Sequence, residues 1–288
     1  MKRKISRQII IYDIIAAVCF LGCLFVGMPS EEPKAEREKI LILGDSIVGI
    51  CRDDTSVTAF MSEFLGEPVY NGALGGTCYS YADADMRLAY TKDCFNLAGL
   101  SQAFYTGDFR PQQHARVREN ATEYFEDVIY DLSTMKLNDI HTVILAYGIN
   151  DYHDAVALSN PEDLYDPYTF EGAMRSSVRY LKKAMPQSRI ILVTPLYSWY
   201  PPLGLTCENY DTGNGFLEDY VNAEMAMAKE LDLEVIDLYH DFYKHDNYED
   251  WKTYTVDGLH PNETGRSMIA RALTDYLQSN DGKDDRAE

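Results

Sequence analysis

The sequence predicts an α/β fold of three layers, α/β/α, whose central and mainly parallel sheet has about five strands. Short apolar runs alternate with longer segments of helical character along the 288-residue chain, as in a parallel sheet that helices cover on both faces. Ile40–Leu43 is apolar at every position, which is typical of a buried strand. Without its first residues, about 38 of them, the chain keeps about 250, an ordinary size for one domain with a large core.

The elements are predicted in the following order. Strands are expected near residues 40–44, 67–71, 142–147, 189–195 and 233–238. Helices are expected near residues 55–65, 117–136, 169–185, 216–231 and 262–278. In the last helix, apolar side chains recur at helical spacing and are expected to face the core: Met268, Ile269, Ala272, Leu273, Tyr276 and Leu277.

Two short stretches from opposite ends of this domain predict a catalytic site. Gly44-Asp45-Ser46 follows the first strand, and a loop where a strand of an α/β sheet ends is where such folds bind ligands. In Asp257-Gly258-Leu259-His260, an Asp and a His three positions apart can point into one cleft. The Asp can then hold the imidazole in the tautomer that accepts a proton from Ser46. This order of residues favours hydrolysis of an ester.

Two further stretches contain the donors that an oxyanion hole needs. Asn71–Thr77 is a glycine-rich turn after a strand-like segment, and Gly148-Ile149-Asn150-Asp151 follows the strand near 142–147. A backbone N–H in such a turn and an Asn amide can stabilise the negative oxygen of a tetrahedral intermediate. The adjacent Asp45 and Asp151 are expected to brace their own turns by hydrogen bonds.

With these four stretches in this order, roughly residues 38–280 resemble the SGNH/GDSL hydrolase superfamily. The family's serine, glycine, asparagine and histidine correspond to Ser46, Gly76, Asn150 and His260, with Asp257 as the third member of the triad. The resemblance implies a flavodoxin-like α/β/α fold and a serine esterase. No cofactor is expected, and no metal site is expected because the sequence has neither a Cys-x-x-Cys pair nor a cluster of His residues. The resemblance also implies that the N–H groups of Ser46 and Gly76 and the Asn150 amide hold the oxyanion.

Each stretch has an alternative interpretation when it is taken alone. Gly-Asp-Ser is ordinary turn chemistry, and Gly148–Asp151 could be a turn with an Asx cap. The Asp257–His260 stretch could be a loop before a helix that Asn262 caps. Gly75 competes with Gly76 if the glycine turn is shifted by one residue.

Two aromatic segments without clear periodicity, 79–116 and 197–216, are predicted to be insertions around the site. Loops on the carboxyl side of such a sheet carry substrate specificity. Their rings could stack on sugars or flank an acyl chain, or they could simply bury their own loops. The candidates for substrate contact are Tyr79, Trp199 and Tyr200.

The first 29 residues predict a membrane segment. Four basic residues precede an apolar stretch from Ile9 to Val26 that only Asp13 interrupts, which is a signal-anchor pattern. We expect residues 1–29 to anchor the protein, 30–39 to form a charged linker, 40–280 to form the catalytic domain outside the cytoplasm, and 281–288 to be a disordered acidic tail. Cleavage or lipidation of the segment is the alternative.

Charge and cysteine content limit the partners. The formal net charge of −20 disfavours nucleic-acid binding, which needs basic patches. The expected partner is an acylated small molecule, glycan or lipid, most simply an O-acylated glycan. The same motifs also allow four alternative functions: lysophospholipase, thioesterase, acyltransferase and a catalytically inactive binding domain. The sequence does not specify disulfide pairing of the four cysteines in the domain or its oligomeric state: Cys51, Cys78, Cys94 and Cys207.

Overall fold

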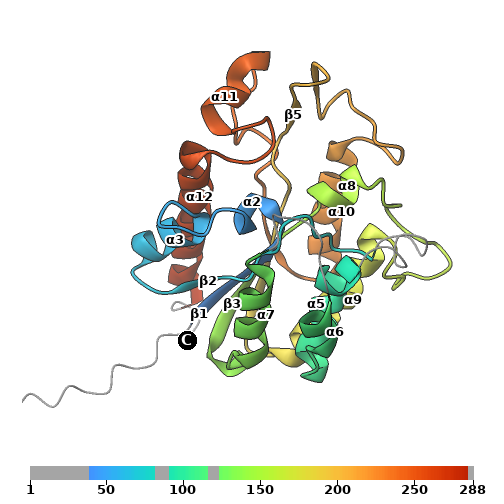
Figure 1. The fold of residues 1–288 in the computed structure, drawn as a ribbon, viewed down its shortest axis with the longest axis vertical. Helices are drawn as coiled ribbons and strands as arrows, with labels where there is room; N and C mark the ends of the chain where they lie inside the picture. The colour runs from blue at the N-terminus through green and yellow to red at the C-terminus, as the bar shows by residue number, and fades with distance from the viewer. Residues whose placement is uncertain (1–38, 82–90, 116–122, 285–288) are drawn as a thin grey trace, which may run out of the picture. The chain divides into compact units, whose positions relative to one another are not determined.

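The computed structural model describes residues 39–81, 91–115 and 123–284 (Figure 1). The predicted membrane segment and all but the last residue of the predicted linker lie outside these ranges, as do residues 285–288. Among the residues described, no helix combines the length and the apolarity needed to cross a membrane. The described residues therefore belong almost entirely to the predicted catalytic domain.

A five-stranded sheet lies at the centre of the domain, and every neighbouring pair of its strands is parallel. The strand order is β2-β1-β3-β4-β7. The chain thus leaves β1 in one direction toward β2 and later returns on its other side as β3, so that a topological switch point lies between β1 and β3. The strands are β1 Lys39–Gly44, β2 Val69–Asn71, β3 Ile140–Ala146, β4 Arg189–Val193 and β7 Glu234–Ile236.

The sheet is buried because helices cover both of its faces (Figure 1). On one face α3 (Val57–Leu65) packs against α12 (Glu263–Asp284). On the other, α9 (Phe170–Ala184) contacts both α5 (Leu97–Thr106) and α10 (Leu217–Glu230). The predicted three-layer architecture is confirmed.

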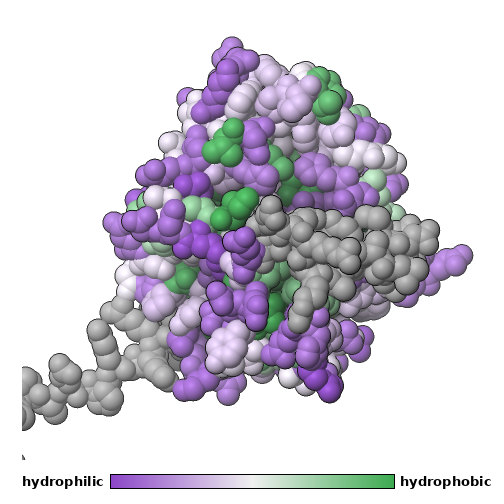
Figure 2. All heavy atoms as spheres, in the orientation of Figure 1, coloured by the Kyte–Doolittle hydropathy of each residue, from purple (hydrophilic) through white to green (hydrophobic). Residues whose placement is uncertain are grey.

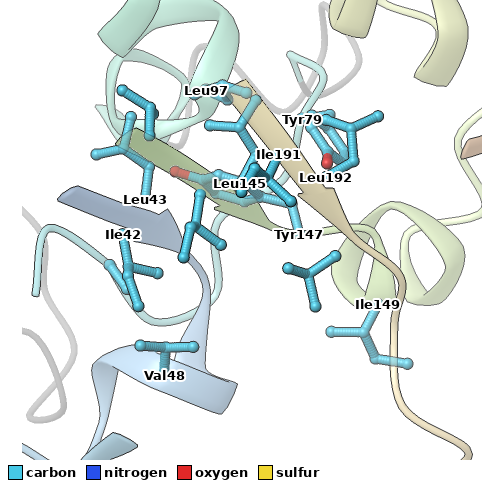
Figure 3. Close-up of a cluster of buried hydrophobic side chains, with 14 of the residues drawn as sticks. Ile42, Leu43, Val48, Tyr79, Leu97, Leu145, Tyr147, Ile149, Ile191 and Leu192 are labelled. Atoms are coloured by element: carbon cyan, nitrogen blue, oxygen red, sulfur yellow. The ribbon is translucent and has the colours of Figure 1, made fainter. Parts of the chain in front are cut away.

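The core forms where the central strands meet these helices. Ile40–Leu43 and Val143–Leu145 are fully or almost fully buried, which explains why these strands are apolar at consecutive positions rather than alternating. Figure 3 shows Ile42, Leu145 and Ile191 within one cluster of packed side chains. On the outer face shown in Figure 2, hydrophilic side chains predominate and hydrophobic ones form separate small patches.

The segment predicted as an aperiodic insertion, 79–116, instead contains helical elements on both sides of α5: η1 (Thr91–Phe95) and α6 (Arg110–His114). The sequence pattern hides α5 because most of its residues are buried, so that it lacks the polar face on which a helical period depends. In the second predicted insertion, β5 (Trp199–Tyr200) and β6 (Leu205–Thr206) form a short antiparallel hairpin.

Two predicted boundaries also differ. The helix expected over 117–136 is described as α7, Phe125–Thr134, and residues 116–122 lie outside the described part. At the other end, α12 continues to Asp284, four residues into the predicted acidic tail. A helix that is already formed adds residues at little cost in free energy, so the end of its apolar pattern does not mark the end of the helix.

Candidate active site

Ser46 lies at the carboxyl end of β1, beside the switch point between β1 and β3. It begins the one-turn helix α2 (Ser46–Gly49), and Asp45 caps that helix by accepting from the Ile47 N–H at 2.9 Å. Gly44 allows this close passage: a Cβ there would lie 2.7 Å from the carbonyl oxygen of Ala146 on β3. The local sequence thus places the serine just beyond the carboxyl end of β1.

The Asp257–His260 loop brings its imidazole to Ser46. Asp257 Oδ1 accepts from the Leu259 and His260 N–H groups at 3.0 and 2.8 Å, and its Oδ2 lies 2.7 Å from His260 Nδ1. His260 Nε2 lies 3.0 Å from Ser46 Oγ. The structure therefore places the serine, histidine and aspartate that the sequence singled out in one continuous chain of hydrogen bonds.

Asp257 is ionised at neutral pH. Partial burial raises the pKa of its carboxyl, but the hydrogen bonds from the His260 ring and from two backbone N–H groups outweigh burial and hold the pKa below its ordinary value. The carboxylate can only accept, so it selects the tautomer with the proton on Nδ1. Nε2 is then left to accept the proton of the Ser46 hydroxyl.

The β5–β6 hairpin supports this loop from outside. The Trp199 N–H donates to the Gly258 carbonyl at 2.9 Å, and Gly258 has a φ of +95°. A Cβ at position 258 would lie 2.5 Å from the Trp199 carbonyl oxygen. Glycine is therefore required twice here, by its backbone conformation and by the close approach of the hairpin.

Two of the three predicted substrate-contacting rings are in the core. Tyr79 is 0% exposed and Trp199 is 1% exposed, so the prediction that these rings contact substrate is wrong. Tyr79 donates its hydroxyl to buried Glu224 at 2.7 Å. Tyr200 is half-buried, and its hydroxyl lies 3.0 Å from Nε2 of His153. The alternation of a strand places Trp199 inward and Tyr200 outward, which aromatic content alone does not indicate.

Asn150 approaches the site from the loop after β3. It lies in α8 (Ile149–His153), and its side-chain N–H donates to the Thr77 carbonyl at 2.9 Å. This bond fixes the amide with its nitrogen toward the glycine turn and leaves its second N–H for a ligand.

The two candidate donors in the glycine turn, the N–H groups of Gly75 and Gly76, differ in their hydrogen bonding. The Gly75 N–H donates to the Tyr124 hydroxyl at 2.8 Å. Within the described part of the chain, the N–H groups of Ser46 and Gly76 have no hydrogen-bond partner. Gly76 has a φ of +72°, which suits glycine. The geometry thus favours Gly76 over Gly75 as the free donor.

Asp151 fastens α8 to the segment that follows the glycine turn. Its carboxyl accepts from the Tyr79 N–H, the Ser80 N–H and the Ser80 hydroxyl at 2.9, 3.1 and 2.7 Å. Burial nonetheless dominates and raises its pKa to about 6. The expectation that each carboxyl braces its own turn is confirmed for Asp45, which caps α2. For Asp151 the described bonds differ from the expectation, because they join α8 to residues 79 and 80 instead.

The pH dependence of stability follows from Asp45. Its carboxyl is buried, and burial, opposed only in part by the Ile47 N–H, raises its pKa from 3.8 to about 7. The folded protein binds more protons than the unfolded chain between these values, so this group lowers stability as pH rises through the window. Asp45→Asn keeps the accepting oxygen and removes the charge. We expect the variant to be more stable than the wild type at pH 8 by on the order of a few kcal/mol.

Urea unfolding at pH 5 and pH 8 checks this expectation. The advantage of Asp45→Asn should shrink at pH 5, where the wild-type carboxyl is already protonated in the folded state. Asp54→Asn, at an exposed position nearby, serves as the matched control and should show no such change. A pH-independent difference between Asp45→Asn and the wild type would contradict the assignment.

Three residues around the site were not predicted from the sequence. Arg52 and Tyr124 contact the glycine turn. His153 follows Asn150 by three residues, which places both on neighbouring positions of α8. Burial, and secondarily the positive charge of His260, lowers the pKa of His153 to about 4, so it is neutral at physiological pH. Helical spacing from Asn150 was the signal that could have identified it.

The remaining chemistry-bearing residues are accounted for as follows. The four described cysteines, Cys51, Cys78, Cys94 and Cys207, are free thiols. Buried Cys78 donates to Asp154 at 3.7 Å. In the described ranges no group of three or more His, Cys, Asp or Glu side chains is arranged to hold a metal ion.

A parallel α/β/α sheet with a Ser–His–Asp arrangement at its carboxyl edge is compatible with the class of carboxylic ester hydrolases. The comparisons with known proteins agree with this class. The family model of GDSL-like lipases/acylhydrolases matches residues 40–273. The chain belongs to this family.

Solved structures share the fold at low sequence identity. A protein from Lactobacillus plantarum is 17% identical with a TM-score of 0.59, over 85% of this chain and 97% of that one. A protein described as a possible lipase from Chitinophaga pinensis is 17% identical with a TM-score of 0.55, over 84% and 98%. A carbohydrate acetylesterase from Sinorhizobium meliloti is 14% identical with a TM-score of 0.52, over 84% and 99%. No curated protein matches the sequence significantly.

Proposed function

We propose that the protein hydrolyses a carboxylic ester through a covalent acyl-enzyme on Ser46. The observation that carries the proposal is the chain of hydrogen bonds from Asp257 through His260 to Ser46 Oγ. His260 Nε2 takes the serine proton as Oγ bonds to the ester carbonyl carbon. The same proton then passes to the leaving alcohol as the ester C–O bond breaks. Water repeats the sequence and releases the acid and the free serine.

The oxyanion is held in this proposal by three donors. These are the free N–H groups of Ser46 and Gly76 and the second N–H of the Asn150 amide. Each comes from a different loop at the same edge of the sheet, and each is available because its surroundings leave it without a partner among the described residues. Donors fixed before the reaction stabilise the developing charge without a cost for reorganisation.

For the substrate, we propose O-acyl groups on a glycan. The His260 side chain is 25% exposed and that of Asp257 is 51% exposed, so the reacting groups lie at the surface, where a bulky alcohol can approach. Tyr200 and His153 add a half-buried aromatic ring and a neutral imidazole near His260, the kind of surface that recognises sugar hydroxyls and ring faces. The shared fold of the carbohydrate acetylesterase is compatible with such a substrate.

For the location, we propose that residues 1–29 anchor the protein in the cytoplasmic membrane with the catalytic domain outside. The support is the sequence pattern of a basic start followed by an apolar stretch. Membrane fractionation of cells that express the full chain, with protease added to intact spheroplasts, checks this arrangement. Recovery in the supernatant, or protection of the domain from protease, would contradict it.

The activity is tested with the purified protein and p-nitrophenyl acetate, butyrate and octanoate, with acetylated xylan and O-acetylated peptidoglycan in parallel. We expect release of acetate from at least one glycan and a preference for the short acyl chain. A preference for octanoate would replace the glycan proposal with a lipid ester. Release of no acid from any ester by folded protein would contradict the hydrolase proposal and favour a transferase that needs an acceptor.

Asn150→Ala tests the oxyanion hole directly. We expect kcat to fall by about 10²–10³-fold, because one of three donors to the oxyanion is lost. KM for p-nitrophenyl acetate should change little, since the donor acts on charge that appears only in the transition state. Asn160→Ala is the control. Among the described contacts, the side-chain N–H of Asn160 donates only to the Asp166 carboxylate. A decrease in kcat of less than about tenfold for Asn150→Ala would contradict the assignment of Asn150 as an oxyanion donor.

A further inference from the structure

Arg52 bonds two backbone segments whose relative position matters for the proposed chemistry. Its Nη1 donates to the carbonyls of Gly49, at the end of α2, and Ala73, in the glycine turn, at 3.1 Å each. Its Nη2 donates to the carbonyl of Asn71. One guanidinium thus bonds both the helix that begins at Ser46 and the turn that contains Gly76, in the planar fork geometry that arginine provides and lysine does not.

Tyr124 extends this connection to the glycines. The Arg52 guanidinium lies over its ring at 4.6 Å from the centroid. The Tyr124 hydroxyl accepts from the Gly75 N–H at 2.8 Å. Gly75 itself lies against the nucleophile, because a Cβ built on it would be 3.6 Å from Ser46 Cβ and 3.2 Å from the Tyr124 hydroxyl. The phenol therefore holds the peptide that directly precedes the free Gly76 N–H.

Such a hold is needed because two consecutive glycines have wide conformational freedom. An oxyanion donor is effective only within about 0.5 Å of its productive position. Most other hydrogen bonds of the turn involve the residues before the glycines: the Leu74 N–H donates to the Gly44 carbonyl, and the Thr77 hydroxyl donates to the Leu74 carbonyl. The hydrogen bond to Tyr124 is the one described contact that fixes the Gly75 N–H.

We propose that Arg52 and Tyr124 form a clamp that holds the Gly75–Gly76 turn against Ser46 and thereby orients the Gly76 N–H toward the oxyanion. The proposal rests on the function proposed above for Gly76. Both are positioning residues, since they act through the backbone of the turn. Neither lies in the four sequence stretches that identify the family.

Tyr124→Phe tests the clamp with the smallest change. The ring remains under Arg52, and only the acceptor of the Gly75 N–H is lost. We expect kcat to fall by about tenfold, less than for loss of a donor itself, while KM stays within about twofold. Tyr130→Phe is the matched control, because Tyr130 lies on α7, the helix that begins directly after Tyr124, and is 65% exposed. An unchanged kcat, or a rise in KM alone, would overturn the proposal.

Arg52→Lys tests the other half of the clamp. A lysine keeps the charge but cannot bond three carbonyls in one plane, so we expect the same fall in kcat without rescue by the conserved charge. Arg271→Lys is its control, since Arg271 also stacks on an aromatic ring, that of Phe64, but on α12. Full activity of Arg52→Lys would overturn the role of the guanidinium.

Hydrogen exchange separates failure of the clamp from failure of the proposed function. Amide exchange in a peptide spanning residues 71–77 should be faster in Tyr124→Phe than in the wild type, with other peptides unchanged. Equal exchange in both proteins would overturn the clamp whatever the activity. A wild type without Ser46-dependent ester hydrolysis, combined with faster exchange in the variant, would contradict the proposed function and leave the clamp supported.

Discussion

Ser46→Ala is expected to reduce ester hydrolysis by about 10⁴-fold or more, because the acyl-enzyme cannot form without the hydroxyl. The residual rate should be that of the oxyanion donors acting on water attack. The only described side-chain partner of Ser46 Oγ is His260 Nε2, so the variant should keep its fold. Release of p-nitrophenol, measured under saturating p-nitrophenyl acetate, gives the fall in kcat, and thermal unfolding verifies the fold.

Ser133→Ala is the matched control for this experiment. Ser133 is a half-buried serine on α7 that donates its hydroxyl to the Tyr130 carbonyl, and its replacement should leave kcat unchanged. A Ser46→Ala variant that retains more than about 1% of wild-type turnover would show that another group carries the reaction.

Asp257→Asn is expected to lower kcat by about 10³–10⁴-fold, although it changes a single atom. Two backbone N–H groups, of Leu259 and His260, already bind Oδ1. An asparagine must keep its oxygen at that position, so its NH₂ group faces His260 Nδ1. That nitrogen must then accept, which moves the ring proton to Nε2 and blocks transfer from Ser46. Steady-state kinetics across pH 6 to 9 measures the loss.

The chain contains its own control for this substitution. Asp237 and His240 have the same spacing and the same contacts: Oδ1 accepts from the Tyr239 and His240 N–H groups, and Oδ2 lies 2.7 Å from His240 Nδ1. Asp237→Asn makes the same chemical change in a loop with the same three contacts, to which Asp237 adds a bond from the Thr194 hydroxyl, and it should leave kcat unchanged. Equal losses in both variants would attribute the effect to general damage rather than to the tautomer of His260.

This internal duplicate also shows how far sequence reasoning reaches. Asp-x-x-His occurs twice, once directly after β7 and once between the short helix α11 (Trp251–Tyr254) and α12, and in both places the Asp carboxylate bonds the His ring and two backbone N–H groups. The two loops differ in what the fold brings to the second imidazole nitrogen: Ser46 Oγ at 3.0 Å from His260, and Glu218 at 3.9 Å from His240. Both pairs follow the other three stretches in the chain, so the order of the stretches does not distinguish them; the fold does, because only the His260 ring is described within hydrogen-bond distance of Ser46.

The central strands β1, β3 and β4 were predictable because they are buried on both faces and are therefore apolar in continuous runs. The capped amphipathic helices α3 and α9 begin where Ser56 and Thr169 accept from the first turn. Helix α5 was not predictable, since burial on most sides removes the period. Arg52 and Tyr124 were also beyond reach, because their functional contacts are with backbone atoms, which leave no pattern in side-chain sequence.

The hydrogen bond between His260 and Ser46 spans 214 positions of the chain. Closing so long a loop costs entropy before any contact offsets it, and contacts of this range slow folding. The histidine loop leads directly into α12, and Arg266 in the first turn of that helix donates to the Thr55 carbonyl just before α3. Docking of α12 therefore completes both the hydrophobic core and the nucleophile. Recovery of esterase activity during refolding would consequently require the docking of α12, and partly folded molecules without it would be chemically silent.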